Sequence, residues 1–140
     1  MNLDEQYLIE TNEQVLKNHK KLTGQQVWIE VIPENIARVF PKVNSVGNSG
    51  NREEDLIEKA ACIMAVIPWA QVFFDGNRRT GIIAAGTFLC DNGYDLDINP
   101  GDENLELRKL LSESKKHYLT LNQDIMKQLS FYISQRMKPL

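Results

Sequence analysis

A short polar turn interrupts the most apolar part of this chain, and it constrains the fold more than any other feature. Before the turn, apolar residues recur at helical spacing up to Pro68. After it, residues 80–91 are apolar on nearly all sides of a helix. Such a helix needs neighbours around its whole circumference, so we expect a central buried helix that begins at the turn, with about four further helices around it.

The other segments mostly repeat an amphipathic helical pattern, and 140 residues suit a single domain over 1–140. We expect one helix over residues 4–22, ended by Gly24, and another that starts at the N-cap Asn51. Between them, Pro33 opens a short helix that ends near Pro41. The last third adds two core-facing stripes, one of Leu105, Leu107, Leu110 and Leu111 and one of Ile125, Leu129, Tyr132, Ile133 and Met137. The predicted fold class is all-α, a bundle of helices.

Residues 26–32 depart from the helical pattern, since they alternate and are rich in β-branched side chains. We expect a short strand there. Its apolar residues Val27, Ile29 and Val31 could lie at an exposed edge or be tucked against the core.

The overall composition is that of an ordinary folded protein. Apolar residues make up 42% and charged residues 25%, which does not fit a disordered chain. The net charge of −3 argues against a general nucleic-acid binder. The sequence shows neither an apolar run of membrane-spanning length nor a signal-like N-terminus. We therefore expect a cytoplasmic protein without nucleic-acid or membrane partners.

The turn itself, over residues 73–81, carries a carboxylate, a glycine, an amide and two guanidinium groups. A glycine turn that leads into a helix N-terminus points backbone N–H groups outward and favours anions. Arg78 and Arg79 could add bidentate contacts to phosphate oxygens, and Asp75 could hold Mg²⁺ shared with a phosphate. The alternative is a plain turn, in which Asn77 caps the next helix and the arginines are solvated. The local chemistry alone does not decide between the two.

The same segment resembles the signature of the Fic/Doc (Fido) family, His-x-Phe-x-Asp/Glu-Gly-Asn-x-Arg. Its Doc-like branch, which contains death-on-curing toxins, continues with Lys/Arg-Arg-Thr-Ala/Gly. The residues in register are Phe73, Asp75, Gly76, Asn77, Arg78, Arg79, Thr80 and Gly81. The resemblance continues more loosely through Phe88-Leu89 and Asn92-Gly93-Tyr94. It covers the chain well from Asp55 to Leu96, and the rest only in the layout of helices. One position departs from the signature, because Gln71 stands where the family has its histidine.

The resemblance implies a domain that transfers AMP or phosphate to a hydroxyl of a target protein, with ATP or another nucleotide and Mg²⁺ as cofactors. It implies that the phosphates bind at Gly76, Asn77, Arg78, Arg79 and Thr80, that Asp75 holds the Mg²⁺, and that Gln71, Asp75, Asn77 and Arg79 occupy the catalytic positions. It also implies a protein partner, either the target or an antitoxin-like chain. The sequence does not distinguish AMP from phosphate as the transferred group.

In proteins of this family a short hairpin, a β flap near the active site, pairs with the target as an added strand, and Val27, Ile29 and Val31 could serve as such an edge. A strand or extended segment tucked against the core is at least as good an interpretation, because the sequence shows no second strand for the hairpin.

Gln71 decides how much activity is expected. The family histidine is the general base, whereas a glutamine amide can orient a hydroxyl but cannot hold its proton. Loss of a general base costs about 10²–10⁴-fold in rate. We therefore favour an impaired or inactive member that keeps its phosphate site; the alternative is a slow transferase in which Gln71 only orients the acceptor. A deliberate replacement of the histidine, made to express a toxic protein, would leave the same sequence.

The remaining candidates for chemistry are two histidines and two cysteines. His19 and His117 lie in lysine-rich polar runs, so we expect solvated surface residues rather than a substitute base. Cys62 and Cys90 lie in apolar segments, so we expect buried thiols rather than a disulfide or a metal site. Some Fic-like proteins carry an inhibitory helix with the pattern Ser/Thr-x-x-x-Glu-Gly/Asn. Residues 49–54 come nearest to it but end in glutamate.

Overall fold

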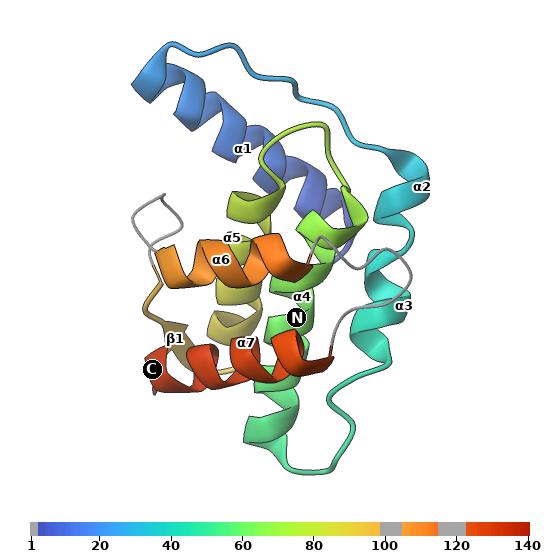
Figure 1. Cartoon of the computed structure of the whole chain (residues 1–140), viewed down its shortest axis with the longest axis vertical. Coiled ribbons are helices and arrows are strands. Elements are labelled where there is room, and N and C mark those ends of the chain that lie inside the picture. The colour runs from blue at the N-terminus through green and yellow to red at the C-terminus, as the bar shows by residue number, and fades with distance from the viewer. Residues whose placement is uncertain (1–2, 99–104, 115–122) are drawn as a thin grey trace.

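The computed structural model describes residues 3–98, 105–114 and 123–140, and it is mainly helical (Figure 1). In chain order the elements are α1 (Glu5–Thr23), α2 (Pro33–Ile36), α3 (Val39–Asn44), α4 (Arg52–Ala70), α5 (Asn77–Asp91), β1 (Tyr94–Leu96), α6 (Leu105–Ser114), α7 (Gln123–Arg136) and β2 (Met137–Pro139). The predicted all-α class is confirmed, with one small sheet added to it.

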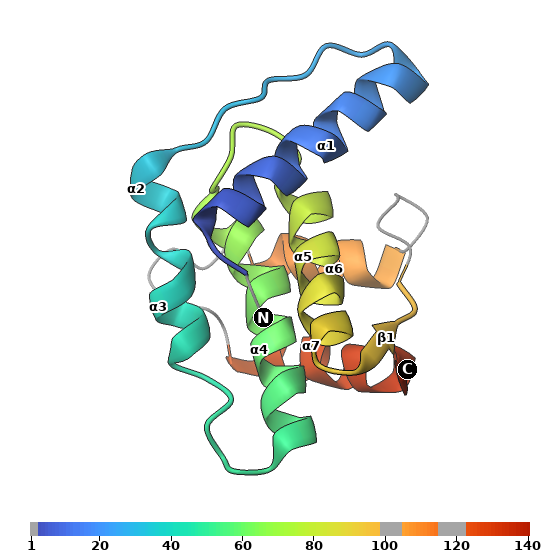
Figure 2. The same cartoon turned by 180° about the vertical axis from the view of Figure 1, so that it is seen from behind.

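Helices α4 and α5 pack side by side at the centre of the fold (Figures 1 and 2). Every residue of α4 from Ala60 to Ala70 is buried, because α3, α5, α6 and α7 surround it. α5 packs on α4 and is covered by α1, but its last turn is open to solvent at Cys90 and Asp91. The helix before the polar turn is thus more completely buried than the helix after it. The expectation of a buried thiol is wrong for Cys90 and confirmed for Cys62.

One glycine sets the close approach of α5 to α4. A Cβ added at Gly81 would lie 2.9 Å from the carbonyl oxygen of Met64. That carbonyl precedes Pro68 by four residues, and proline has no N–H to donate to it. A missing side chain on α5 therefore faces a carbonyl on α4 that lacks its usual helical donor. The apolar spacing predicts that this helix ends at Pro68, but α4 continues to Ala70 with the proline inside it.

The helix ends expected at Gly24 and Asn51 are confirmed. Gly24 adopts a left-handed conformation with φ 72°, and its N–H donates to the carbonyl of Lys20 at 2.8 Å. The side chain of Asn51 accepts a hydrogen bond from the N–H of Glu54 at 3.0 Å, which satisfies a donor that the helix leaves open. Pro41, by contrast, does not end a helix. It lies in the first turn of α3, where proline is tolerated because no intrahelical N–H bond is required there.

The expected strand over residues 26–32 is absent. These residues form an extended connection that runs from α1 across to α2 (Figure 1). The connection pairs with the loop between α4 and α5 through a single bridge, Val31 with Phe73. Two hydrogen bonds flank it, one from the N–H of Ile32 to the carbonyl of Val72 at 2.8 Å and one from the N–H of Phe74 to the carbonyl of Glu30 at 3.0 Å. The alternating pattern is typical of extended backbone, but a strand also needs a partner of its own length.

A two-stranded antiparallel sheet lies beyond the end of α5. In it β1 pairs with β2, and Asp95 lies opposite Lys138. The last apolar stripe predicts a helix that includes Met137, whereas α7 ends at Arg136 and the chain then becomes extended. The N–H of Leu140 donates to the carbonyl of Gly93 at 3.0 Å, so the described C-terminal residues are tied to the segment that follows α5.

Helices α6 and α7 complete the core on one side of α4 (Figure 1). The two stripes predicted to face the core do so at Leu107, Leu111, Ile125, Leu129, Tyr132 and Ile133, all of which are buried. Leu105 does not, since it is exposed at the start of α6. Within the described part of the chain, no helix is both long enough and apolar enough to cross a membrane.

Candidate functional site

The loop that joins α4 to α5 is shaped by two residues in the left-handed region. Gln71 ends α4 with φ 52° and ψ 57°, and Gly76 precedes α5 with φ 76°. Gln71 is the one non-glycine residue with a positive φ among those that the structure describes. Left-handed backbone costs an ordinary side chain about 1–2 kcal/mol, so the surrounding contacts must hold this residue in place. The conformation reverses the chain directly after α4 and turns position 71 toward the start of α5.

Asn77 closes the loop through its side chain. Its Oδ1 accepts from the N–H of Phe73 at 2.9 Å, and its Nδ2 donates to the carbonyl of the same residue at 2.8 Å. The Phe73 side chain is buried in the core, which anchors the middle of the loop. The amide of Asn77 is therefore committed to the loop. What this residue offers to a ligand is its backbone N–H in the first turn of α5.

A buried asparagine ties the loop to α1. Nδ2 of Asn12 donates to the carbonyl of Asp75 at 2.7 Å and to Oγ1 of Thr80 at 3.2 Å. A Cβ at Gly76 would lie 3.0 Å from the Leu16 side chain, so the space beside α1 is tight, and the positive φ of 76° favours glycine further. Thr80 is completely buried on this side. Its hydroxyl therefore packs the loop and does not face a ligand, which corrects its assignment to phosphate binding.

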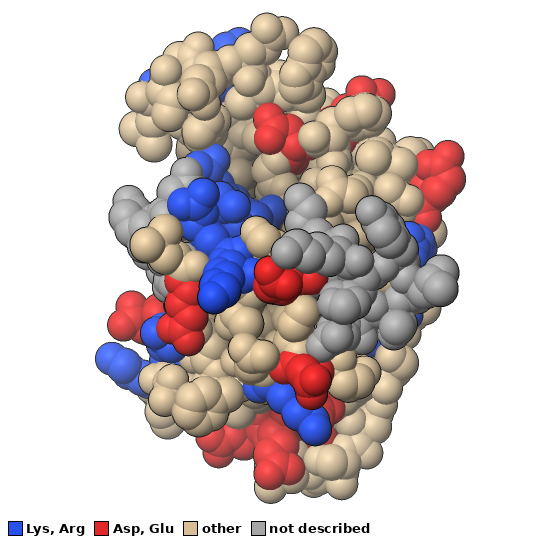
Figure 3. All heavy atoms as spheres, viewed as in Figure 1, with Lys and Arg blue, Asp and Glu red and all other residues tan. Residues whose placement is uncertain are grey.

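The N-terminus of α5 opens into a pocket of about 420 Å³. The N-cap is Gly76, and no side chain caps the first turn, so backbone N–H groups of that turn are directed outward. Arg78 and Arg79 belong to the same turn and are partly exposed. Figure 3 shows Lys and Arg atoms gathered where α5 begins and α6 crosses it. The pocket is lined by His19, Pro68, Gln71, Phe74, Asp75, Gly76, Asn77, Arg78, Arg79, Leu111 and Ser112.

The structure thus brings most of the predicted site residues together around one positive helix end. The helix dipole, the open N–H groups and two guanidinium groups all favour an anion at this place. A pocket of this volume lies within the range of small-molecule sites, about 300–1,000 Å³. It can therefore hold a phosphorylated small molecule, with its phosphates at the first turn of α5.

Asp75 is suited to share a Mg²⁺ ion with such a phosphate. Its Oδ1 accepts from the N–H of Gly76 at 2.9 Å, and the carboxylate lines the pocket beside the helix end. The described residues contain no cluster of three or more His, Cys, Asp or Glu side chains that could hold a metal by themselves. Magnesium is commonly bound by one or two carboxylates together with substrate phosphates and water. A lone carboxylate next to an anion site fits that mode.

Gln71 lines the same pocket and is partly engaged with the end of α4. Its Nε2 donates to the carbonyl of Pro68 at 2.7 Å, in the last turn of the helix. A carbonyl accepts only from a donor, so the amide nitrogen must face Pro68 and Oε1 is the remaining polar atom of the side chain. Oε1 can accept a hydrogen bond from a hydroxyl. It cannot take the proton away.

His19 also lines the pocket, which corrects its assignment as a solvated surface residue. Its Nδ1 lies 2.9 Å from a terminal nitrogen of Arg79, and its Nε2 lies 2.8 Å from Oε1 of Gln25. The helical spacing in the sequence indicates this position of His19. His19 follows Asn12 by seven residues and Leu16 by three, so the three residues share one helix face, and that face packs on the loop. His117 lies outside the described residues.

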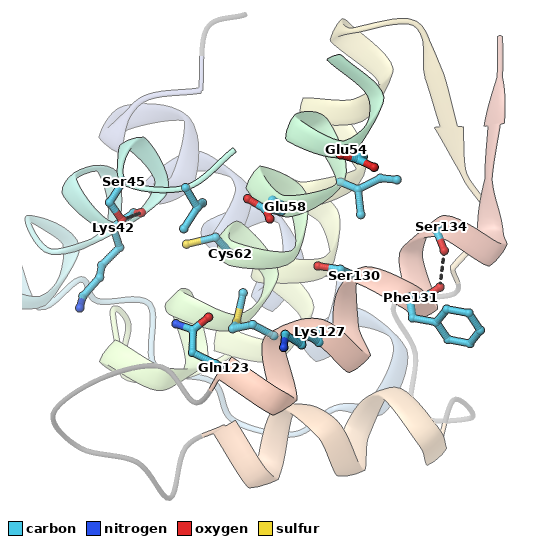
Figure 4. A pocket seen from close by; sticks show the side chains of 13 residues that line it. Lys42, Ser45, Glu54, Glu58, Cys62, Gln123, Lys127, Ser130, Phe131 and Ser134 are labelled. Atoms are coloured by element: carbon cyan, nitrogen blue, oxygen red, sulfur yellow. Dashed lines mark hydrogen bonds between the residues drawn. The ribbon is translucent and has the colours of Figure 1, made fainter. Parts of the chain in front are cut away.

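A second and larger pocket, of about 570 Å³, lies between α3, α4 and α7 (Figure 4). Its polar lining mixes lysines with carboxylates, among them Glu54 and Glu58. Carboxylates would repel phosphates. Cys62 also lines it, and burial raises the pKa of that thiol to about 11, so the thiol stays protonated near neutral pH. We therefore assign the functional site to the smaller pocket at α5.

A model of the Fic/DOC family matches residues 2–89. The matched region contains α1, the loop at residues 71–76 and nearly all of α5, and α6 and α7 follow it. Domains of this family are of the type that transfers AMP or phosphate, and they generally use a nucleotide, Mg²⁺ and a protein target. No curated protein matches the chain. Because the family model covers more than half of the sequence, the protein belongs to the Fic/DOC family.

Proposed function

We propose that this protein is a Doc-like member of the family that binds a Mg²⁺-bound nucleotide but is impaired in the transfer step. One observation carries the proposal: the open N-terminus of α5, with Arg78 and Arg79 in its first turn, faces a pocket whose histidine position is occupied by Gln71. Groups suited to bind phosphates line the pocket. The glutamine at position 71 cannot accept the proton of an acceptor hydroxyl.

Each residue of the loop has a distinct part in the proposed complex. Backbone N–H groups at the start of α5 and the guanidinium of Arg78 bind the phosphates. Arg79 stabilises the charge of the transferred group, because it can reach two oxygens at once. Asp75 would hold Mg²⁺, which when bound supplies neutralisation of the phosphate charge. Asn77 acts earlier, since its side chain fixes the loop that presents these groups.

The described residues supply no evident replacement for the missing base. His19 is the imidazole that lines the pocket, but its Nδ1 accepts a hydrogen bond from Arg79 and its Nε2 is engaged by Gln25. Neither ring nitrogen is open to an acceptor hydroxyl in this arrangement. Transfer without a base is slower by about 10²–10⁴-fold, which amounts to loss of function for a protein-modifying enzyme.

A slow transferase is the second candidate, and the geometry of Gln71 is the observation in its favour. With Nε2 held by Pro68, Oε1 is the atom that could orient an acceptor hydroxyl toward the phosphate. Phosphoryl transfer depends mainly on positioning and charge stabilisation, so an oriented hydroxyl retains part of the rate. In either case the protein partner is a target that presents a hydroxyl or an antitoxin-like chain that blocks the pocket.

The test is label transfer from α- and γ-labelled ATP with Mg²⁺ into a cell lysate. We expect transfer by the unmodified sequence to lie at or below detection, about 10²–10⁴-fold slower than transfer by Gln71→His. The label that moves names the reaction, AMP or phosphate. Arg79→Ala in the Gln71→His background should abolish the signal. Arg52→Ala in the same background should not, because Arg52 lies at the far end of α4 and donates to the carbonyl of Asn92.

Other outcomes separate the two candidates. Clear labelling by the natural sequence, lost in Arg79→Ala, would establish the slow transferase. Failure of the natural sequence to bind Mg²⁺-ATP in calorimetry would refute the proposal at its binding step. If Gln71→His binds the nucleotide and still transfers nothing, the impairment extends beyond this residue.

A further inference from the structure

We propose that His19 is a positioning residue of the phosphate site, which acts by holding the guanidinium of Arg79 at the pocket. This inference rests on the proposed function for its consequence, since it assigns Arg79 to the phosphates. It adds a residue from α1 to a site that the loop and α5 otherwise define. Sixty residues separate the two side chains in sequence, and they meet at 2.9 Å.

The contacts of His19 define which of its nitrogens carries the proton. Arginine has only donors, so Nδ1 must offer its lone pair to the terminal nitrogen of Arg79. Oε1 of Gln25 has only lone pairs, so Nε2 must donate its proton to that oxygen at 2.8 Å. The two partners lie on opposite sides of the ring and select the same neutral tautomer. Gln25 thus orients the ring, and the ring orients Arg79.

The backbone explains why Gln25 reaches back to His19. Gly24 ends α1 in the left-handed conformation, and the chain reverses there. The side chain of Thr23 donates to the carbonyl of His19 at 2.8 Å and accepts from the N–H of Gln25 at 3.2 Å. The end of α1 therefore keeps Gln25 close to His19 through the side chain of Thr23. It lies at the wall of the pocket, where His19 itself is partly buried.

A guanidinium can contact a side chain and a ligand at the same time. Arginine has five N–H donors in a planar fork, and one of those of Arg79 is directed at His19. A phosphate that meets other donors of the fork then costs less side-chain freedom, because the contact with His19 helps to set the orientation before the ligand arrives. The positive charge of Arg79 is kept, since a neutral imidazole competes with the phosphate for one donor and not for the charge.

Two substitutions of nearly equal shape separate this role from a general effect on folding. His19→Asn keeps an acceptor at the δ position of the side chain, whereas His19→Leu has methyl groups there. Leucine is the better helix former, so stability alone would favour His19→Leu. The proposal predicts the reverse order for the restraint of Arg79 and for nucleotide affinity, in which His19→Asn should exceed His19→Leu. Asn18→Leu is the matched control, because Asn18 is an exposed neighbour on the same turn.

The first measurement observes Arg79 without any ligand. In ¹⁵N-labelled full-length protein, we expect the side-chain nitrogens of Arg79 to give resolved signals in the natural sequence and in His19→Asn. In His19→Leu these signals should shift or broaden, because one restraint on the guanidinium is removed. Identical Arg79 signals in all three proteins would overturn the proposal. This result does not depend on nucleotide binding, so it holds even if the proposed function fails.

The second measurement is the affinity for Mg²⁺-ATP by calorimetry. We expect His19→Leu to weaken binding by about 3- to 10-fold, the size of one ordinary hydrogen bond, and His19→Asn to stay within about twofold. In the Arg79→Ala background, His19→Leu should have no further effect. An equal loss in both backgrounds would mean that His19 acts by another route, which contradicts the proposal. Absence of binding by the natural sequence would instead refute the proposed function, and the ligand-free measurement would then decide alone.

Discussion

At position 71 the backbone itself is compatible with the missing histidine. Gln71 is left-handed, with φ 52°. Among non-glycine residues, histidine is enriched with asparagine and aspartate in this region. Gln71→His therefore places no new demand on the loop, whose shape is fixed by Asn77 and by the contact with α1. This is why activity in the restored variant is informative: a failure would reflect the site and not a collapsed loop.

Asn12 is the residue on which the shape of the loop depends most. It is buried, and its side chain serves both the carbonyl of Asp75 and the hydroxyl of Thr80. Replacement by leucine keeps the volume and leaves two buried acceptors without this donor. We expect Asn12→Leu to lower the free energy of unfolding by about 1–3 kcal/mol in urea titrations. The affinity for Mg²⁺-ATP should fall as well, because Asp75 and the first turn of α5 lose their anchor.

A control on the same helix separates the anchor from helix effects. Gln6→Leu introduces the same side chain at an exposed position, where Gln6 donates to Glu10 in the next turn at 3.2 Å. Its free energy of unfolding should stay within about 0.5 kcal/mol of the natural value. Should Asn12→Leu prove as stable as Gln6→Leu, the buried hydrogen bonds would not be what fixes the loop.

At the scale of elements, the contact between α4 and α5 can be tested with two glycines of one helix. At Gly81 an added methyl group meets the carbonyl of Met64 at 2.9 Å, whereas at Gly86 it meets nothing within 4 Å. We expect Gly81→Ala to lower the free energy of unfolding by about 1–3 kcal/mol through overpacking. Gly86→Ala should raise it by about 0.5–1 kcal/mol, because alanine is the better helix former. Denaturant titrations of both variants measure the difference.

The two substitutions are expected to change the free energy of unfolding in opposite directions, which makes the comparison sensitive. Both substitutions add the same group to the same helix, so helix propensity cancels between them. If Gly81→Ala were stabilising like Gly86→Ala, the two helices would be able to move apart without cost. The close approach at Gly81 would then not explain how α5 is held at the pocket.

The sequence was sufficient for the helices and for the loop, because their signals are local. The caps at Gly24 and Asn51 and the apolar spacing within α1 and α4 depend on neighbours within a few residues. The short strand over residues 26–32 failed for the opposite reason. A strand is defined by its partner, and this segment pairs with the loop at Phe73 through a single bridge. The small sheet of β1 and β2 was missed likewise, since its strands lie far apart in the sequence.

The function of the site stays a prediction, and the sequence could define its lining only within one continuous segment. The motif residues do gather at the start of α5, with Thr80 turned away from the pocket. The sequence analysis missed the residues that other helices contribute, His19 from α1 and Leu111 and Ser112 from α6. His19 stands in a polar run that is typical of a solvated face. Only its helical register with Asn12 indicated otherwise.

At the scale of the whole molecule, the last helices are as much a part of the core as the matched family region. α6 and α7 lie beyond residue 89, where the family match ends, yet Leu107, Leu129 and Ile133 are almost completely buried. α7 packs on α4, whose C-terminal end leads into the loop. Loss of this contact would expose the apolar face of α4 next to the site. We therefore propose that the chain unfolds as one cooperative unit.

Leu129→Ala tests that cooperativity. The residue is fully buried on α7, so the substitution should cost about 2–5 kcal/mol. Two probes should report the same shift of the melting temperature: far-ultraviolet circular dichroism for all helices, and the fluorescence of Trp69 at the end of α4. The measurement is made in a Trp28→Phe background, because Trp28 is 62% exposed and would add a solvent signal. Phe131→Ala is the control on the same helix, and its side chain is 63% exposed, so its cost should stay below about 0.5 kcal/mol. A shift seen by circular dichroism and not by Trp69 would mean that α7 melts separately from the helix that carries the site.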